Sequence, residues 1–146
     1  MGRIHRGVTL SEVTVSLAII IMLALIAIPQ YGVAAVDRDA DATADIVREV
    51  QASIDAFHQA RGRYPGTVEA DWFPLNKMVT PYRPEVKRTM IERGGFGEAE
   101  PLDPRLSGPA GYWYNAETGS FRAFVPDQGT PGATQKLFER VNRYAR

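Results

Sequence analysis

The stretch Arg6–Tyr31 reads RGVTLSEVTVSLAIIIMLALIAIPQY, and it decides the fold expected of this chain. From Val8 to Ile28 it is mostly apolar, and a helix of that length rises about 31 Å, close to the thickness of the hydrocarbon core of a bilayer. The acid Glu12 interrupts the run near its start, and Pro29 follows its end. The stretch therefore predicts a membrane-spanning helix, residues 8–29, that carries one carboxylate.

Two bases precede the apolar run. Arg3 and Arg6 lie in the leader Met1–Gly7, which contains no acid. Basic residues collect on the cytoplasmic flank of a spanning helix. We therefore expect a single-pass protein of the inner (cytoplasmic) membrane, with its N-terminus in the cytoplasm and the bulk of the chain in the periplasm.

Beyond Pro29 the pattern becomes amphipathic. Apolar residues recur at steps of three and four among charged ones, which indicates that a helix continues over residues 30–62 with one apolar stripe. We expect the helix to kink at Pro29 rather than stop there, and to end near Gly62 in a left-handed cap. The stripe consists of Val36, Ala40, Thr43, Val47, Val50, Ile54 and Phe57.

The rest of the chain, residues 63–146, predicts a small globular head. Aromatic and β-branched runs over 112–114 and 121–125, separated by a loop that ends in glycine, predict a β-hairpin. Residues 84–93 predict a short helix, with proline in its first turn and two glycines past its end. Leu137, Phe138, Val141 and Tyr144 have helical spacing and indicate a C-terminal helix. The expected fold class is α+β: a long kinked N-terminal helix packed on a small antiparallel β-sheet.

Composition excludes several kinds of site. The chain has 146 residues, a formal net charge of zero and no cysteine, which rules out disulfides, thiolate nucleophiles and Cys-based zinc sites. Its two histidines, His5 and His58, lie far apart in the sequence. No Ser-His-Asp set, paired carboxylates or phosphate loop is recognisable, so we expect no enzyme, and the dense basic face of a nucleic-acid-binding protein is also missing.

Glu12 is the main clue to function, because a carboxylate in a spanning helix is costly and is usually paired or functional. A cut after Gly7 would create a new α-ammonium group on Val8. That amine would lie four residues from Glu12, about one helical turn away, on the same face. Glu12 could pair with it within the chain, or with the amine of a neighbouring copy if the helices pack side by side with an axial offset.

Gly7-Val8-Thr9-Leu10-Ser11-Glu12-Val13, followed by an apolar run that ends Ala27-Ile28-Pro29-Gln30-Tyr31, resembles the N-terminus of type IV pilins and pseudopilins. The resemblance covers about the first thirty residues and implies a pilin-like fold. It implies cleavage between Gly7 and Val8 by a prepilin peptidase and N-methylation of Val8. It also implies assembly of the chain into a helical filament through its N-terminal helix, with Glu12 as the assembly contact.

The head has a weaker resemblance to pseudopilins of the type II secretion system, closest to their major subunit. It rests on Arg63-Tyr64-Pro65, Pro101-Leu102-Asp103-Pro104, Trp113-Tyr114-Asn115 and Thr118-Gly119. Such heads are often associated with a calcium site in their last loops. Asp103, Glu117 and Asp127 would be the oxygen ligands here, although their spacing is not that of a dense calcium loop.

The resemblance implies a structural subunit of a type IV pilus-like filament, most like a type II secretion pseudopilin, in the periplasm or at the cell surface. Its implied partners are other copies of the chain, other pilins or pseudopilins, the prepilin peptidase, an inner-membrane assembly platform, and membrane lipid before assembly. Two alternatives remain open: a minor pilin of an adhesion or DNA-uptake pilus, and a signal-anchored periplasmic domain that never polymerises.

Overall fold

The computed structural model describes residues 9–144, except for the side chains of residues 25–34 and 76. The chain forms two compact units, Met1–Asp37 and Arg38–Arg146. The elements in chain order are α1 (Leu10–Arg61), the 3-10 turns η1 (Ala70–Trp72) and η2 (Pro74–Asn76), β1 (Met90–Arg93), β2 (Ala110–Tyr114), β3 (Phe121–Ala123) and α2 (Pro131–Val141).

Helix α1 has 52 residues and contributes to both units. Its backbone is helical through Pro29, and a bend at that residue stays a prediction. The helix ends where the sequence predicts: Gly62 has a φ of +67°, and its N–H donates to the carbonyl of His58 at 2.8 Å. A glycine adopts this left-handed conformation without the steric cost that a side chain would add.

The expectation of a membrane-spanning half was wrong. In the part of the chain that the structure describes, no helix is long and apolar enough to cross a membrane. The described side chains in the apolar part of α1 are those of residues 10–24, fewer than the roughly 20 that a crossing needs. The inner-membrane location that we inferred from the spanning helix is withdrawn with it.

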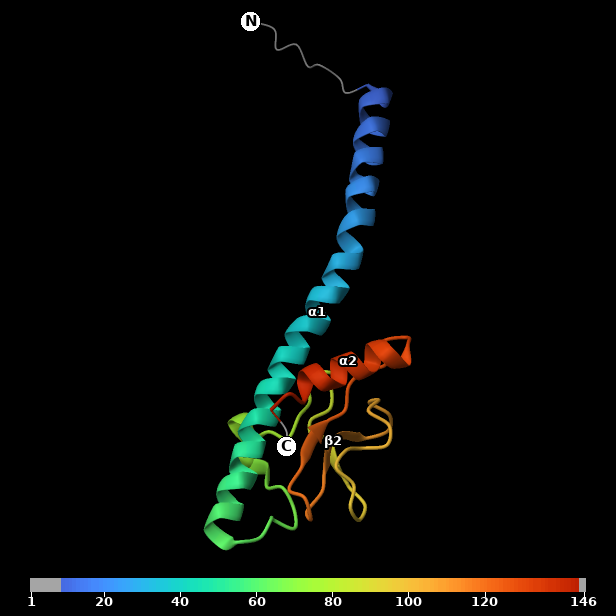
Figure 1. Cartoon of the computed structure of the whole chain (residues 1–146). Coiled ribbons are helices and arrows are strands. Elements are labelled where there is room, and N and C mark those ends of the chain that lie inside the picture. The colour runs from blue at the N-terminus through green and yellow to red at the C-terminus, as the bar shows by residue number, and fades with distance from the viewer. Residues whose placement is uncertain (1–8, 145–146) are drawn as a thin grey trace, which may run out of the picture. The chain divides into compact units, whose positions relative to one another are not determined.

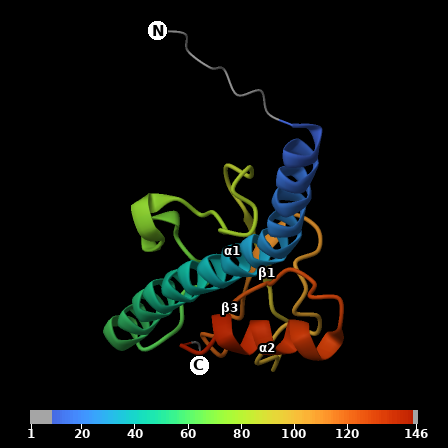
Figure 2. The same cartoon turned by 90° about the horizontal axis from the view of Figure 1, so that it is seen from above.

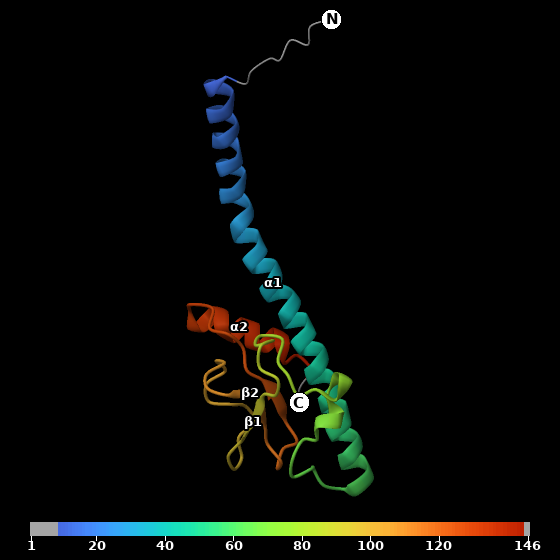
Figure 3. The same ribbon diagram turned by 180° about the vertical axis from the view of Figure 1, so that it is seen from behind.

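The second unit is built on the amphipathic part of α1. Figures 1 and 3 show the sheet and α2 on the same side of this part of the helix. In the view from above, the 3-10 turns η1 and η2 lie on one side of α1 and α2 on the other (Figure 2). The stripe that faces the core is the one expected from the sequence: its fully buried members are Ala40, Thr43, Val47, Val50 and Ile54.

The sheet is mixed, whereas we expected an antiparallel one. Its strand order is β1-β2-β3; β1 pairs with β2 in parallel, and β2 pairs with β3 antiparallel. β2 and β3 coincide with the expected hairpin. The parallel pair arises because residues 94–109 form a long connection that returns the chain to the start of the sheet, which parallel pairing requires.

Strand β1 also corrects a second expectation, that residues 84–93 form a helix. Residues 84–88 form turns, and the strand then begins at Met90. The Thr89 N–H donates to the Met78 carbonyl at 2.8 Å, and the Met90 N–H donates to the Pro109 carbonyl at 3.3 Å. These long-range backbone bonds, together with the β-branched Thr89 and Ile91, outweigh the local helix signals.

The outer edge of β3 is closed by two side-chain amides. Gln51 of α1 accepts from the Phe121 N–H at 3.1 Å and donates to the Gly119 carbonyl at 3.0 Å. Asn142, at the end of α2, accepts from the Ala123 N–H at 2.8 Å and donates to the Ala123 carbonyl at 3.1 Å. The two amides make the backbone hydrogen bonds that a neighbouring fourth strand would otherwise make. They thereby protect the edge of β3 from pairing with a strand of another chain.

The Gln51 amide should be essential for stability. In Gln51→Ala, the Phe121 N–H and the Gly119 carbonyl stay buried without a partner, and we expect the free energy of unfolding to fall by about 3 kcal/mol. Urea denaturation of the full chain measures this. Gln59→Ala, at an exposed site of the same helix, is the matched control. Equal stability of the two variants would contradict the edge-closing role of Gln51.

Candidate functional site

The N-terminal part of α1 is apolar on all sides and exposed. Between Leu10 and Leu23, nine large apolar side chains have more than half of their surface exposed, from 52% at Val13 and Ile21 to 82% at Leu10. A helix that is apolar all round is normally buried. This part of the chain therefore needs an apolar environment that the described residues do not supply.

Glu12 takes part in a capping box at the start of this helix. Its carboxylate oxygen Oε2 accepts from the Thr9 backbone N–H at 2.8 Å and from the Thr9 hydroxyl at 2.9 Å. In return, the Glu12 N–H donates to the Thr9 hydroxyl oxygen at 3.3 Å. The sequence T-L-S-E at 9–12 has the S/T-x-x-E signature of this motif, so the cap can be read from the sequence, whereas we expected Glu12 to pair with the Val8 amine of its own chain or of a neighbouring copy.

These bonds favour the ionised form of Glu12. Above all the Thr9 backbone N–H, and then the Thr9 hydroxyl, lower the pKa of the carboxyl below its usual value. Because the pKa is lowered in the folded helix, the cap contributes stability above the usual glutamate range and loses it as the pH falls through the lowered pKa. Near neutral pH, Glu12 is a fixed negative charge at the first turn of an exposed apolar helix.

The expected processing site, Gly7 and Val8, lies outside the described residues, as does N-methylation of Val8. The proposed kink residue, Pro29, lies inside the helical backbone of α1, but its side chain is outside the description. Gly7, Val8, Glu12 and Pro29 are the N-terminal residues to which the sequence assigns a role. Of these four, the structure describes the side chain of Glu12.

The three calcium candidates do not come together as a ligand set. No cluster of three or more His, Cys, Asp or Glu side chains suited to a metal ion occurs among the described residues. Instead, each candidate has a polar partner from the chain. Glu117 accepts from the Gly97 N–H at 3.1 Å, and Asp127 accepts from the Gly129 N–H at 2.9 Å and the Thr134 hydroxyl at 3.3 Å.

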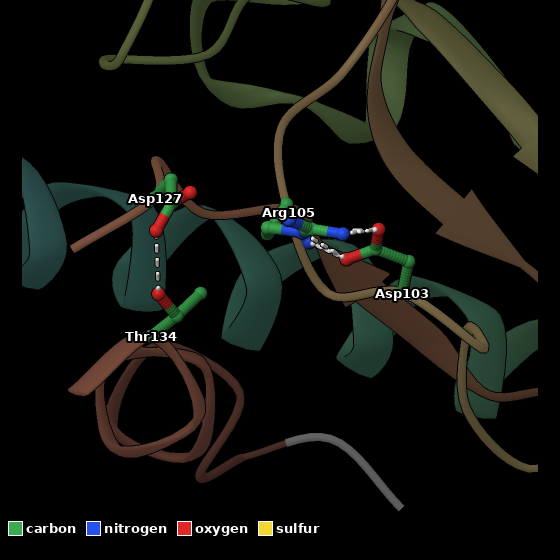
Figure 4. Close-up of polar contacts among 4 residues, drawn as sticks. All are labelled: Asp103, Arg105, Asp127 and Thr134. Atoms are coloured by element: carbon green, nitrogen blue, oxygen red, sulfur yellow. Dashed lines mark hydrogen bonds and ion pairs between the residues drawn. The ribbon is translucent and has the colours of Figure 1, made fainter. Parts of the chain in front are cut away.

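Arg105 supplies the cation at Asp103. Figure 4 shows the Arg105 guanidinium beside the Asp103 carboxylate, with Asp127 bonded to Thr134 nearby. Arg105 Nε donates to Asp103 at 2.9 and 3.1 Å, and its Nη2 donates at 2.7 Å. The hydrogen bonds and the charge of Asp103 raise the pKa of the Arg105 guanidinium, and the negative charge of Asp127 adds to the rise. The Asp103 carboxylate is thus paired with a positive side chain of the chain itself, and calcium binding by the three candidates stays a prediction.

Comparison of the chain with known proteins found no match. No protein-family model matches the chain, and neither a curated protein nor a solved structure matches it.

The pairing of Asp103 with Arg105 predicts a pH response. Hydrogen bonds from the Arg105 side chain and backbone lower the pKa of Asp103 to about 2. The contribution of this pair to stability is therefore present above the usual aspartate pKa of about 3.9 and is lost as the pH falls towards 2. We expect Arg105→Gln to raise the Asp103 pKa towards the usual value, measured by NMR titration of the carboxyl carbon. Arg88→Gln is the control, and an unchanged Asp103 pKa in Arg105→Gln would contradict the pairing.

Proposed function

We propose that this chain is a structural subunit of a type IV pilus-like filament, of the pseudopilin kind, which is processed between Gly7 and Val8 and assembles through its N-terminal helix. The single observation that carries the proposal is the run of exposed apolar side chains between Leu10 and Leu23, with Glu12 as its one charged residue. The resemblance of residues 7–31 to the pilin N-terminus supports it.

Association of these helices has a large driving force. Burying a large aliphatic side chain contributes about 1.5–3 kcal/mol, and the run from Leu10 to Leu23 has nine that are mostly exposed. Neighbouring helices of the same sequence offer the matching apolar surface. Because the side chains are apolar on every face, one helix can contact several neighbours at once, as the core of a filament requires.

Glu12 would set the register of this packing. Removal of Met1–Gly7 leaves the ammonium group of Val8 about one turn from Glu12. In a neighbouring copy that is offset along the helix axis, the same ammonium group can approach the Glu12 carboxylate. A buried pair of this kind adds specificity more than net stability, because an unpaired charge in an apolar bundle is strongly disfavoured. The Thr9 bonds keep Glu12 ionised for this pairing.

The second unit fits the role of a folded head. It has a core of its own that includes Tyr112, Trp113, Phe121 and Val141. Three of its aromatic rings pack together: Phe73 lies 5.3 Å from Tyr112, and Tyr112 lies 5.2 Å from Phe121, between ring centroids. This unit therefore does not need the apolar N-terminal helix for its fold, and the helix is available for contacts with other copies.

Two variants separate the pairing role of Glu12 from its capping role. Glu12→Gln keeps a capping box but removes the charge, whereas Thr9→Val removes the hydroxyl and keeps the charge. We expect Glu12→Gln to lower the amount of sedimentable polymer at least about tenfold, and Thr9→Val to change it by no more than about twofold. Sedimentation of polymer sheared from cells measures both.

Intact-mass spectrometry of the same samples checks that Met1–Gly7 is removed from each variant. Wild-type amounts of polymer from Glu12→Gln would contradict the pairing role. Polymer built from chains that keep Met1–Gly7 would contradict the processing step.

A further inference from the structure

A cavity of about 610 Å³ lies along the outer edge of β1. Six consecutive residues, 88–93, form one of its walls, and the segment Gly66–Ala70 forms another. A strand turns alternate side chains to opposite faces, so a cavity against one face would contact every second residue. Contact with each residue from 88 to 93 therefore places this cavity beside the edge of the strand. We call it the β1 cavity.

Main-chain groups of β1 face the β1 cavity. The N–H groups of Met90 and Gly94 donate on the β2 side of the strand, that of Gly94 to the Tyr114 carbonyl at 2.9 Å. Because backbone groups alternate along a strand, the N–H and C=O groups of Ile91 and Arg93 point away from β2. In the described part of the chain, no backbone hydrogen bond outside the sheet involves these two residues. The sheet is thus asymmetric: side-chain amides close the β3 edge, whereas the β1 edge is open.

The chain itself pairs with the start of this edge and then leaves it. The Thr89 N–H, two residues before Ile91, donates to the Met78 carbonyl at 2.8 Å. Farther along, Arg93 Nη2 donates to the Gly66 carbonyl at 3.2 Å, so a side chain connects β1 to the opposite wall. These two bonds hold the walls of the β1 cavity in place without filling the edge between them. A preformed site loses little ordering entropy when a ligand binds.

The size of the β1 cavity matches a short strand. Four residues of a strand are about 13 Å long, neighbouring strands lie about 4.8 Å apart and stacked sheets about 10 Å apart, so such a segment occupies on the order of 600 Å³. The cavity has about 610 Å³, and β1 itself has four residues. An extended segment of about the length of β1 would therefore fill it.

The lining of the β1 cavity is balanced in charge. It contains two acids and two bases, which are Glu69, Glu92, Arg88 and Arg93. Its apolar part includes Val68, Met78 and Ile91. A ligand with a net charge gains no preference from such a lining, whereas main-chain amides match the open donors and acceptors of the edge. The complementary ligand is an uncharged peptide with an apolar side chain at every second position.

We propose that the β1 cavity binds an extended, uncharged segment of another polypeptide, which adds to the sheet as a fourth strand beside β1. Its main chain pairs with Ile91 and Arg93, and its apolar side chains contact Val68 and Met78. In strand addition of this kind, main-chain hydrogen bonds supply affinity and side-chain contacts supply selectivity. The site lies wholly in the second unit and does not involve Glu12, so it is independent of the proposed filament contact.

Hydrogen exchange, measured amide by amide on dispersed full-length chains, tests the proposal. The probe is a pentapeptide, capped at both ends, in which valine alternates with threonine. We expect exchange of the Ile91 and Arg93 amides to slow at least about tenfold as the probe is raised to about 10 mM, because a ligand at about ten times its Kd protects its site by this factor. Unchanged exchange of these two amides would overturn the proposal.

Two controls separate strand addition from other binding. A probe methylated at every backbone nitrogen keeps the side chains but cannot pair as a strand, and it should give no protection. Thr67→Trp, at an exposed position of the lining, should fill the cavity and abolish protection, whereas Ala99→Trp, at an exposed position on the connection after β1, should leave it unchanged. Circular dichroism checks that both variants fold. Equal protection by the methylated probe, or full protection in Thr67→Trp, would also overturn the proposal.

Discussion

Burial of the apolar stripe of α1 against the sheet is the interaction on which the second unit depends. Val47, Val50 and Ile54 have no exposed surface, and each contributes about 1.5–3 kcal/mol by burial. Gln51 lies among them and bonds the backbone of β3 at Gly119 and Phe121. Apolar burial alone would allow the helix to shift along the sheet, and the Gln51 amide fixes its position.

The N-terminal unit presents the opposite situation. Its described apolar side chains are exposed from Leu10 to Leu23, and Glu12, the one acid of that stretch, accepts hydrogen bonds from Thr9. The same helix thus carries one apolar stripe that is buried within the chain and one apolar surface that the described residues leave exposed. In the proposed filament, the second unit is the head, and the N-terminal helix completes its packing against other copies of the chain.

Local patterns predicted the elements that depend on local physics. The three- and four-residue spacing gave the buried stripe of α1, and aromatic runs around a loop ending in Gly119 gave the strands β2 and β3. The prediction of a helix over residues 84–93 was wrong because the proline and glycine signals are local. The strand β1 forms through backbone hydrogen bonds of Thr89 and Met90 to Met78 and Pro109, which are distant in the sequence. The parallel pairing of β1 with β2 depends on the path of a long connection, which no short pattern encodes.

The candidate site was predicted less completely. The sequence singled out Glu12, but its capping bonds were overlooked. The calcium hypothesis named Asp103, Glu117 and Asp127 and stays a prediction; in the structure the Asp103 carboxylate is paired with Arg105, two residues away.

The central claim is that other copies of the chain bury the N-terminal helix. Alkylation of an Ile20→Cys variant tests it most directly, because Ile20 is 61% exposed in the isolated chain. The account predicts that alkylation slows at least about tenfold when dispersed chains become sedimentable polymer, since a buried site must open before it reacts. A Gln135→Cys variant, on the exposed surface of α2, should react at the same rate in both states. An Ile20→Cys thiol that reacts equally fast in polymer and in dispersed chains would contradict the claim.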